Sequence, residues 1–290
     1  MGIHLLPLLS AIVYVIGALF LKRGADLGAG TWGTVWVCNL VAAIGFSPLL
    51  LLGGGPPIGL PYWQPAVVGM LFIAGQVFTF RSLQIGDVSI ATPILGVKIV
   101  LVAVLTALLL RERVAPAVWT AAMLSTAAVA LLNANWGGRH RRVSSTIAMA
   151  GLGAICYALF DVLVQRWASA WGIGRFLPLM MGFVAMFSLP WWWLRQPAPA
   201  ASKRWILAGA ICLAVQSVMF VSTIALFGQA AVANVLYSSR GLWSVLAVWF
   251  IGRWFHNREH LLGGRVLAGR LVGAALLMTA ILLVLLAPRT

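Results

Sequence analysis

The stretch VSIATPILGVKIVLVAVLTALLL, residues 88–110, is 23 residues long and carries one charged side chain, Lys98. An apolar run of this length crosses the hydrocarbon core of a bilayer, which is roughly 30 Å thick. Lys98 lies about eleven residues from either end of the run, or roughly 16 Å along a helix. A lysine stem cannot reach the headgroups over that distance. We therefore expect its ammonium group to face a polar cavity or a partner inside the protein.

A second apolar run, AAVANVLYSSRGLWSVLAVWFIG at residues 230–252, has Arg240 as its only charge. Arg240 follows Lys98 by 142 residues, and the same offset relates Ala91 to Ala233. Two cations at equivalent points of two membrane spans indicate an internal repeat, with halves 1–142 and 143–290. Offsets of 143 and 140 extend the repeat to pairs of rare polar residues, which are Tyr14 with Tyr157 and Gln76 with Gln216.

The composition is that of a polytopic membrane protein. Of 290 residues, 62% are hydrophobic and 9% charged, against about a quarter charged in soluble domains. The net charge of +15 comes mostly from cations between apolar runs, which set topology and meet lipid headgroups, so no nucleic-acid partner is expected. Cys38, Cys156 and Cys212 fall inside apolar runs without paired spacing, which is typical of buried thiols and not of disulfides or metal ligands.

Apolar runs of spanning length recur along the whole chain and are joined by short links rich in Gly, Pro and Arg. The first begins almost at residue 1, without a basic segment before it, and is expected to be a spanning helix and not a signal peptide. The predicted runs are 4–22, 32–53, 63–81, 88–110, 116–135, 146–166, 175–194, 205–227, 230–252 and 266–286.

The predicted fold class is an all-α integral membrane protein with ten transmembrane helices arranged as two inverted five-helix repeats. The inversion follows because an odd number of helices per half places the halves in opposite orientations. In transporters built this way the binding site lies near the midplane, at the repeat interface. Links after odd-numbered runs hold thirteen cations against five on the other side. The positive-inside rule then predicts a multi-pass protein of the cell (inner) membrane with both termini outside the cytoplasm.

The fourth run closes with LLLRERV (108–114), which contains Glu112, and the first run contains YVIGALFLKRGAD (14–26). With these stretches and its ten expected helices, the chain resembles the drug/metabolite transporter (DMT) superfamily, in particular its ten-helix EamA-type members. LLLRERV is similar to the family's apolar-Gly-Glu-Arg ending, with Glu112 in the acidic place, and residues 14–26 are similar to the family's first helix. The second half departs from the pattern at Gly252-Arg253 and at YSSRGLW (237–243). The resemblance implies export or exchange of a small metabolite by alternating access, without naming it.

Three charges inside apolar runs are the strongest candidates for the chemistry. The acidic residue is Asp161, in YALFDVLVQR (157–166), and one carboxylate cannot neutralise both Lys98 and Arg240. An anionic substrate would complete the balance, with Arg suited to bidentate binding and Lys acting as a point charge. A purely structural ion pair and proton coupling stay open, and so does a state in which Asp161 holds Arg240 until substrate displaces it.

Uncharged donors form the rest of the predicted substrate site. Each has a structural alternative: interhelical hydrogen bonds or an interfacial belt for the tyrosines and glutamines, and bonding to its own helix for the serine. The candidates are Tyr14, Tyr157, Gln76, Gln216 and Ser239.

The main prediction is thus a secondary transporter of a small anionic metabolite or anionic headgroup, driven by protons or a counter-substrate. A first alternative is export of amino acids or amphipathic compounds, with Asp161 binding the amine. The alternative from another class is a non-transporting accessory subunit or an intramembrane enzyme. An enzyme would need a nucleophile–base pair, and the apolar runs of this sequence show none. His256-x-x-Glu259-His260 has zinc-motif spacing but no third ligand nearby, so neither a metal nor a cofactor is predicted.

Overall fold

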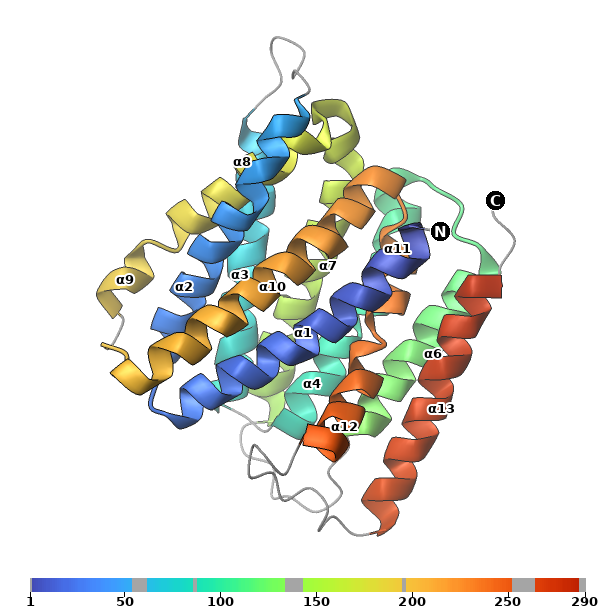
Figure 1. The fold of residues 1–290 in the computed structure, drawn as a ribbon. Helices are drawn as coiled ribbons and strands as arrows, with labels where there is room; N and C mark the ends of the chain where they lie inside the picture. The colour runs from blue at the N-terminus through green and yellow to red at the C-terminus, as the bar shows by residue number, and fades with distance from the viewer. Residues whose placement is uncertain are drawn as a thin grey trace. The chain divides into compact units, whose positions relative to one another are not determined.

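The structure, a computed structural model, describes residues 2–53, 62–85, 88–133, 143–194, 197–251 and 264–286. Within these ranges the chain is helical throughout, without a strand (Figure 1). The helices of the first half are α1 (Gly2–Asp26), α2 (Thr31–Phe46), η1 (Ser47–Leu52), α3 (Trp63–Ile85), α4 (Val88–Gly96), α5 (Lys98–Leu105), η2 (Thr106–Leu110) and α6 (Pro116–Asn133). Those of the second half are α7 (Val143–Trp171), α8 (Ile173–Phe187), α9 (Pro190–Leu194), α10 (Ala200–Phe227), α11 (Ala230–Tyr237), α12 (Arg240–Ile251) and α13 (Gly264–Leu286).

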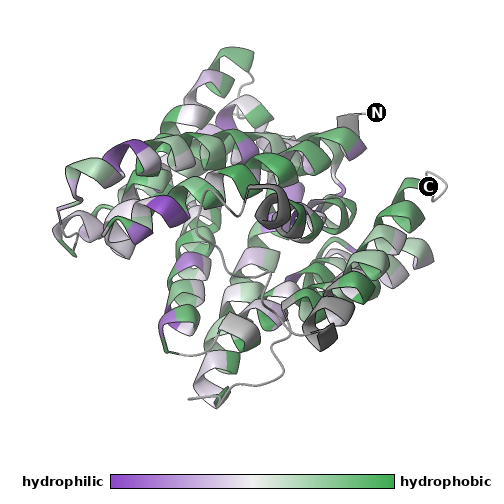
Figure 2. Cartoon of the chain, turned by 60° about the horizontal axis from the view of Figure 1, so that its bottom comes forward, coloured by the Kyte–Doolittle hydropathy of each residue, from purple (hydrophilic) through white to green (hydrophobic). Residues whose placement is uncertain are grey.

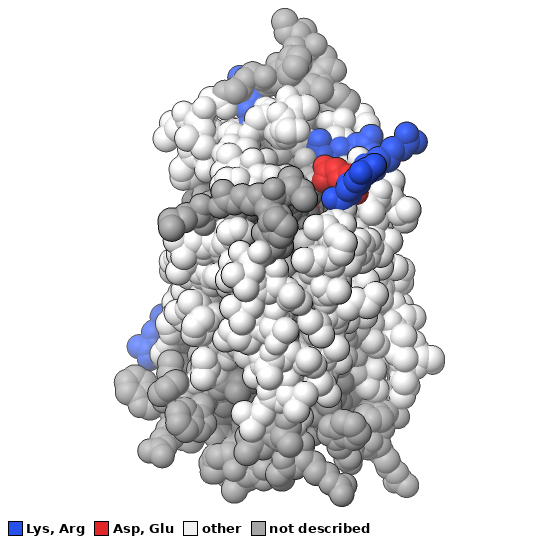
Figure 3. Space-filling model, turned by 90° about the vertical axis from the view of Figure 1, so that its right-hand side faces the viewer, with Lys and Arg blue, Asp and Glu red and all other residues white. Residues whose placement is uncertain are grey.

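Several of these helices have the length and composition of membrane spans. Seven segments of the described chain are long and apolar enough to cross a membrane. Two further apolar helices, Pro116–Leu132 and Leu271–Leu286, are shorter. Green, hydrophobic residues accordingly cover most of the ribbon in Figure 2. On the face drawn in Figure 3 most described side chains are uncharged, and acidic side chains lie beside basic ones. The all-helical, multi-pass class is confirmed, while ten spans and the inverted repeat stay predictions.

The chain divides into two compact units, each built from two separate stretches. One unit comprises residues 1–73 and 163–228, and the other comprises residues 74–162 and 229–290. Each unit therefore takes helices from before and after residue 142. The halves 1–142 and 143–290 are a different division, based on a repeat in the sequence, and that repeat stays a prediction.

In the first unit, α1 lies along α10, and α2 packs on α10 and α8. Small residues allow α1 and α10 to approach closely. A Cβ atom on Gly209 would lie 3.0 Å from the carbonyl oxygen of Gly17 and 2.6 Å from a methyl carbon of Leu21. Close backbone approach through small residues is the usual way in which membrane helices associate, because lipid offers no hydrophobic driving force between them.

In the second unit, α13 lies along α6, while α4, α5 and α11 also pack on α6. Alanines form much of this side of α6, and Ala121, Ala122 and Ala128 are fully buried. Gly273 of α13 lies where a Cβ atom would stand 3.0 Å from the carbonyl oxygen of Ala128. The small side chains of α6 thus let four helices reach it, and two of them, α5 and α11, carry residues of the candidate site.

Four runs that the sequence predicts as single spans are divided in the structure. The run 32–53 becomes α2 and η1, the run 175–194 becomes α8 and α9, and the other two are the runs that carry Lys98 and Arg240. The run 88–110 divides at Val97 into α4 and α5 and then continues as one turn of π-helix, η2. The run 230–252 divides at Ser238 and Ser239 into α11 and α12. In both cases the interruption falls immediately before the cation, so that Lys98 opens α5 and Arg240 opens α12.

Candidate functional site

The interruption before Lys98 is a single tightened turn. The amide of Val97 donates to the carbonyl of Ile94, three residues earlier, at 3.0 Å. The hydroxyl of Thr126 on α6 donates to the carbonyl of Gly96 at 3.3 Å. The helix end is therefore supported by its neighbour, and the backbone of Lys98 is held at a fixed place in the unit.

The interruption before Arg240 is made by two serines. Ser238 donates its hydroxyl to the carbonyl of Val235, and the amide of Ser239 donates to the carbonyl of Leu236 at 3.1 Å. Serine hydroxyls that bond to nearby carbonyls compete with regular helix geometry. The chain turns there and presents Arg240 as an exposed side chain, with its guanidinium carbon 4.8 Å from the centre of the Tyr237 ring.

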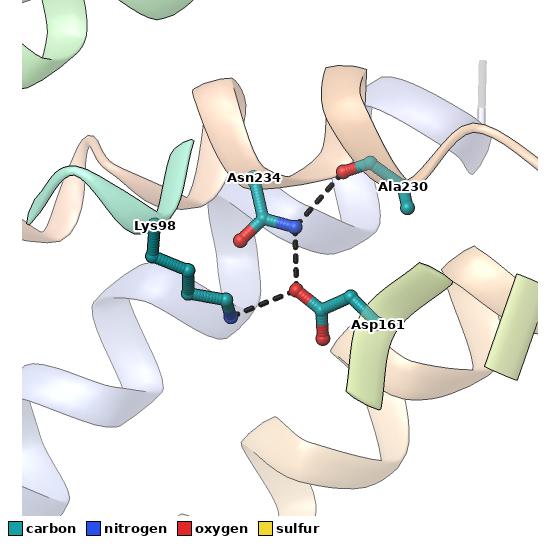
Figure 4. Close-up of polar contacts among 4 residues, drawn as sticks. All are labelled: Lys98, Asp161, Ala230 and Asn234. Atoms are coloured by element: carbon teal, nitrogen blue, oxygen red, sulfur yellow. Dashed lines mark hydrogen bonds and ion pairs between the residues drawn. The ribbon is translucent and has the colours of Figure 1, made fainter. Parts of the chain in front are cut away.

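An ion pair joins Lys98 to the buried carboxylate of α7. The Lys98 Nζ atom lies 2.8 Å from Asp161 Oδ2, and the two side chains are 20% and 1% exposed. Asn234 on α11 donates from Nδ2 to the same carboxylate oxygen at 2.7 Å and to the carbonyl of Ala230 at 2.9 Å. Figure 4 shows these contacts, which bring α5, α7 and α11 to one point. A buried charge is tolerated when it is paired and hydrogen-bonded in this way.

The second carboxylate oxygen is different, because Asp161 Oδ1 is buried without a hydrogen-bond donor among the described residues. Nearby, the Tyr157 ring centre lies 5.8 Å from Lys98 Nζ, within reach of a cation–π contact. Gly75 on α3 makes room for this ring, since a Cβ atom there would stand 2.9 Å from it. The cluster therefore has one saturated carboxylate oxygen, one open one, and a lysine that is partly accessible.

The remaining predicted donors are distributed over both units. Ser239 is 2% exposed, and its hydroxyl is buried without a partner among the described residues. Gln76 lies half-buried on α3. Tyr14 on α1 and Gln216 on α10 belong to the first unit, where Gln216 donates to the Ser217 hydroxyl at 2.7 Å and its Oε1 is buried without a donor. The second unit thus contains Lys98, Asp161, Tyr157, Gln76, Ser239 and Arg240.

Sequence reasoning left Tyr237 out of the predicted site and gave Asn234, like Asn39, only as a weaker candidate for it. Asn234 donates a hydrogen bond to the carboxylate that Lys98 contacts, and the ring of Tyr237 lies against the guanidinium group of Arg240. Both had a signal in the sequence. Asn234 is an amide inside an apolar run, and Tyr237 stands three residues before Arg240, which places it on the preceding helical turn.

The described residues hold no group of three or more His, Cys, Asp or Glu that could bind a metal ion. The His256-x-x-Glu259-His260 segment lies outside the described residues. The candidate site consists of one paired lysine, one carboxylate, one arginine and neutral donors, which suits reversible binding of a polar solute.

Apolar spanning helices with charged groups held inside them define a multi-pass membrane protein, and comparison with known proteins narrows that class. A crystal structure of a protein 17% identical in sequence has the same fold, with a TM-score of 0.68 over 96% of this chain and 95% of the other. No curated protein gives a significant match to the sequence.

The model of the EamA-like transporter family matches residues 1–134. This family is part of the drug/metabolite transporter superfamily, so the resemblance found in the sequence is confirmed over these residues. The match indicates a membrane transporter of the DMT kind.

Proposed function

We propose that the protein is a secondary transporter that exports or exchanges a small anionic metabolite, or a molecule with an anionic headgroup, by alternating access. Ten spans in two inverted repeats, placed in the cell (inner) membrane with both termini outside, would provide the two exchanging orientations. Lys98 and Arg240 would bind the negative group. Tyr14, Tyr157, Gln76, Gln216 and Ser239 would orient the rest of the substrate.

The observation that carries this proposal is the placement of the two cations. Lys98 and Arg240 occupy equivalent points of the predicted repeat, and each is the first residue after a helix interruption. In transporters with discontinuous helices, the amino-terminal ends of half-helices point at anionic substrate groups, because free N–H groups and the helix dipole favour negative charge there. A cationic side chain at the same place adds to that preference.

The charge balance supports an anion in particular. Lys98 and Asp161 form a pair that is neutral overall, so the cation of Arg240 is the charge in excess among the three. A cationic substrate would meet a site that already carries positive charge, whereas an anion would neutralise it. Arg240 is also exposed and can be reached without breaking the buried pair.

A thermal-shift screen of detergent-purified protein tests the proposal against carboxylates, phosphorylated sugars, nucleotides, polyprenyl phosphates and amino acids. A ligand at 100 times its Kd stabilises the folded state by about 2.7 kcal/mol. We expect an anion to stabilise the parent but neither Lys98→Ala nor Arg240→Ala. Lys22→Ala, at an exposed cation near the end of α1, is the matched control and should respond like the parent. An anion response that survives in both site variants would refute the proposal.

A second candidate is export of amino acids or amphipathic compounds. The open Oδ1 atom of Asp161 favours it, because this atom has room for a donor such as a substrate amine. In that case zwitterions would stabilise the parent in the same screen, simple carboxylates would not, and Asp161→Asn would abolish the response.

A further inference from the structure

The exposed side of α10 is charged at its beginning and apolar along its length. Lys203 and Arg204 are exposed in the first turns of the helix. Leu207, Ile211 and Val215 follow and are 51%, 49% and 46% exposed. Counted from Arg204 they stand three, seven and eleven positions further on, a spacing that keeps them on one side of a helix. These five residues form what we call the α10 stripe. The two cations of the proposed substrate site belong to the other unit.

Further positive charge gathers at the same end of this unit. Helices α1 and α10 lie side by side (Figure 1). The end of α1 meets the beginning of α10, because a Cβ atom on Gly24 would lie 3.7 Å from the Cβ atom of Trp205. Arg23 lies in the last turn of α1, with Lys22 before it and the exposed acid Asp26 after it. The described residues of this end therefore carry four cations, including those of the α10 stripe, against one carboxylate.

Tryptophan side chains place this end at the level of the lipid headgroups. Trp is enriched at membrane–water interfaces, where its ring lies among the headgroups. In the first turn of α2, just after the end of α1, the Trp32 ring centre lies 5.3 Å from that of Trp191 in α9. Trp193, at the end of α9, is 85% exposed. The Arg204 guanidinium carbon lies 5.2 Å from the centre of the Trp205 ring, which holds this cation at the same level.

We propose that the α10 stripe is a binding site for an anionic glycerophospholipid. The lipid phosphate pairs with Arg204 and Lys203, since arginine offers two N–H groups to phosphate oxygens and lysine offers a point charge. One acyl chain lies along the three apolar residues. Val215 stands eleven residues beyond Arg204, roughly 16 Å along the helix, and the hydrocarbon layer of one leaflet is roughly 15 Å deep. The stripe therefore has the length of one acyl chain.

The stripe favours a lipid over a soluble phosphate. A soluble anion would meet exposed cations alone, and salt screens such contacts. A lipid adds apolar contact along the helix and is concentrated in the bilayer that surrounds it. Net charge then selects among lipids, because a cation near an anionic membrane surface contributes roughly fivefold in affinity. A zwitterionic lipid balances its own phosphate and gains little from Lys203 and Arg204.

The test compares two lipids that share their acyl chains and their phosphate, dioleoylphosphatidylglycerol and dioleoylphosphatidylcholine. Native mass spectrometry of the delipidated full chain measures both Kd values. We expect the parent to bind the anionic lipid up to about 25-fold more tightly, at roughly fivefold for each of two cations. Lys203→Gln/Arg204→Gln should abolish this preference.

A matched control removes the same charge from the other end of the unit. Arg166 lies near the end of α7, and Arg175 lies in the first turn of α8, which packs on η1. Because η1 follows the end of α2, these arginines are remote from Trp32. Arg166→Gln/Arg175→Gln should keep the lipid preference of the parent.

The outcomes decide the proposal in either direction. Equal Kd values for the two lipids in the parent would overturn it, and so would a preference that persists in Lys203→Gln/Arg204→Gln. Should the double variant not fold, the two single variants decide, because each should weaken binding of the anionic lipid about fivefold. Single variants that bind this lipid like the parent would also overturn the proposal.

Two further probes test the part played by the acyl chain. Dihexanoylphosphatidylglycerol has the same headgroup, and its chains are too short to follow the stripe. It should bind at least about tenfold more weakly than the dioleoyl lipid, since less apolar area is buried. sn-Glycerol 3-phosphate should leave the melting temperature unchanged. A rise equal to that given by the dioleoyl lipid would assign the cations to a soluble phosphate and overturn the lipid site.

The α10 stripe can also be told apart from the proposed substrate site. Binding of a phosphorylated lipid that is lost in Lys203→Gln/Arg204→Gln belongs to the stripe and does not count toward the substrate anion. The lipid site therefore stands or falls independently of the proposed transport function.

Discussion

Substituting either partner of the Lys98–Asp161 pair should destabilise the protein by unequal amounts. Lys98→Met leaves a carboxylate that is 1% exposed without its cation, whereas Asp161→Asn leaves an ammonium group that is 20% exposed. Removing one partner of a buried ion pair costs about 3–5 kcal/mol, because the other charge stays uncompensated. We place Lys98→Met at the upper end of that range and Asp161→Asn at or below its lower end, since the lysine is less deeply buried than the carboxylate.

The double variant Lys98→Met/Asp161→Asn removes both charges and should recover most of the loss. The expected interaction energy between the two sites is about 2–3 kcal/mol, within the range found for directly contacting residues. At roughly 2–4 °C per kcal/mol for chains of 150–250 residues, a loss of 3 kcal/mol lowers the melting temperature by about 6–12 °C. Melting followed by intrinsic Trp fluorescence in detergent measures it, with Asp26→Asn as a control that should stay within about 0.5 kcal/mol of the parent. Additive effects in the double variant would refute the view that these two charges depend on each other.

Three further substitutions test other parts of the structure. Gly209→Val should separate α1 from α10 and lower the melting temperature by several degrees, because the added methyl groups meet backbone at close range. Tyr237→Leu should weaken binding of the stabilising anion about two- to fivefold, since it removes a cation–π contact of about 0.5–1 kcal/mol that holds Arg240; an unchanged Kd would contradict that role. Trp171→Phe should cost about 1–2 kcal/mol by removing the 2.8 Å bond to Gln64, and a melting curve like that of the parent would show that the bond contributes nothing.

Much of the fold could be predicted from sequence because membrane spans are determined by length and hydropathy. The interruptions were partly visible: Pro93 and Gly96 precede Lys98, and Ser238, Ser239 and Gly241 surround Arg240. Their outcome, a break placed immediately before each cation, depends on support from other helices such as the Thr126 hydroxyl of α6. Such support is a tertiary contact and leaves no local pattern.

For the candidate site, too, the sequence identifies the residues but not the contacts between them. Because charges inside apolar runs are rare and costly, Lys98, Asp161 and Arg240 could be found by inspection. Which cation lies beside Asp161 depends on how α7 packs against α5 and α11, and the amide of Asn234 that completes the contact comes from another element. Roles for these residues rest on the experiments described above.

The division of each compact unit into two distant stretches has a consequence for synthesis. Helix α1 ends at Asp26, and its packing partner α10 begins at Ala200. At roughly 5–20 residues per second, about 9–35 s pass between the completion of one helix and the first residue of the other. During that time Gly17 has no α10 against which to close. The pairing of α1 with α10 is thus a late event, whereas α4 and α5 can pack on α6 as soon as residue 133 has been made.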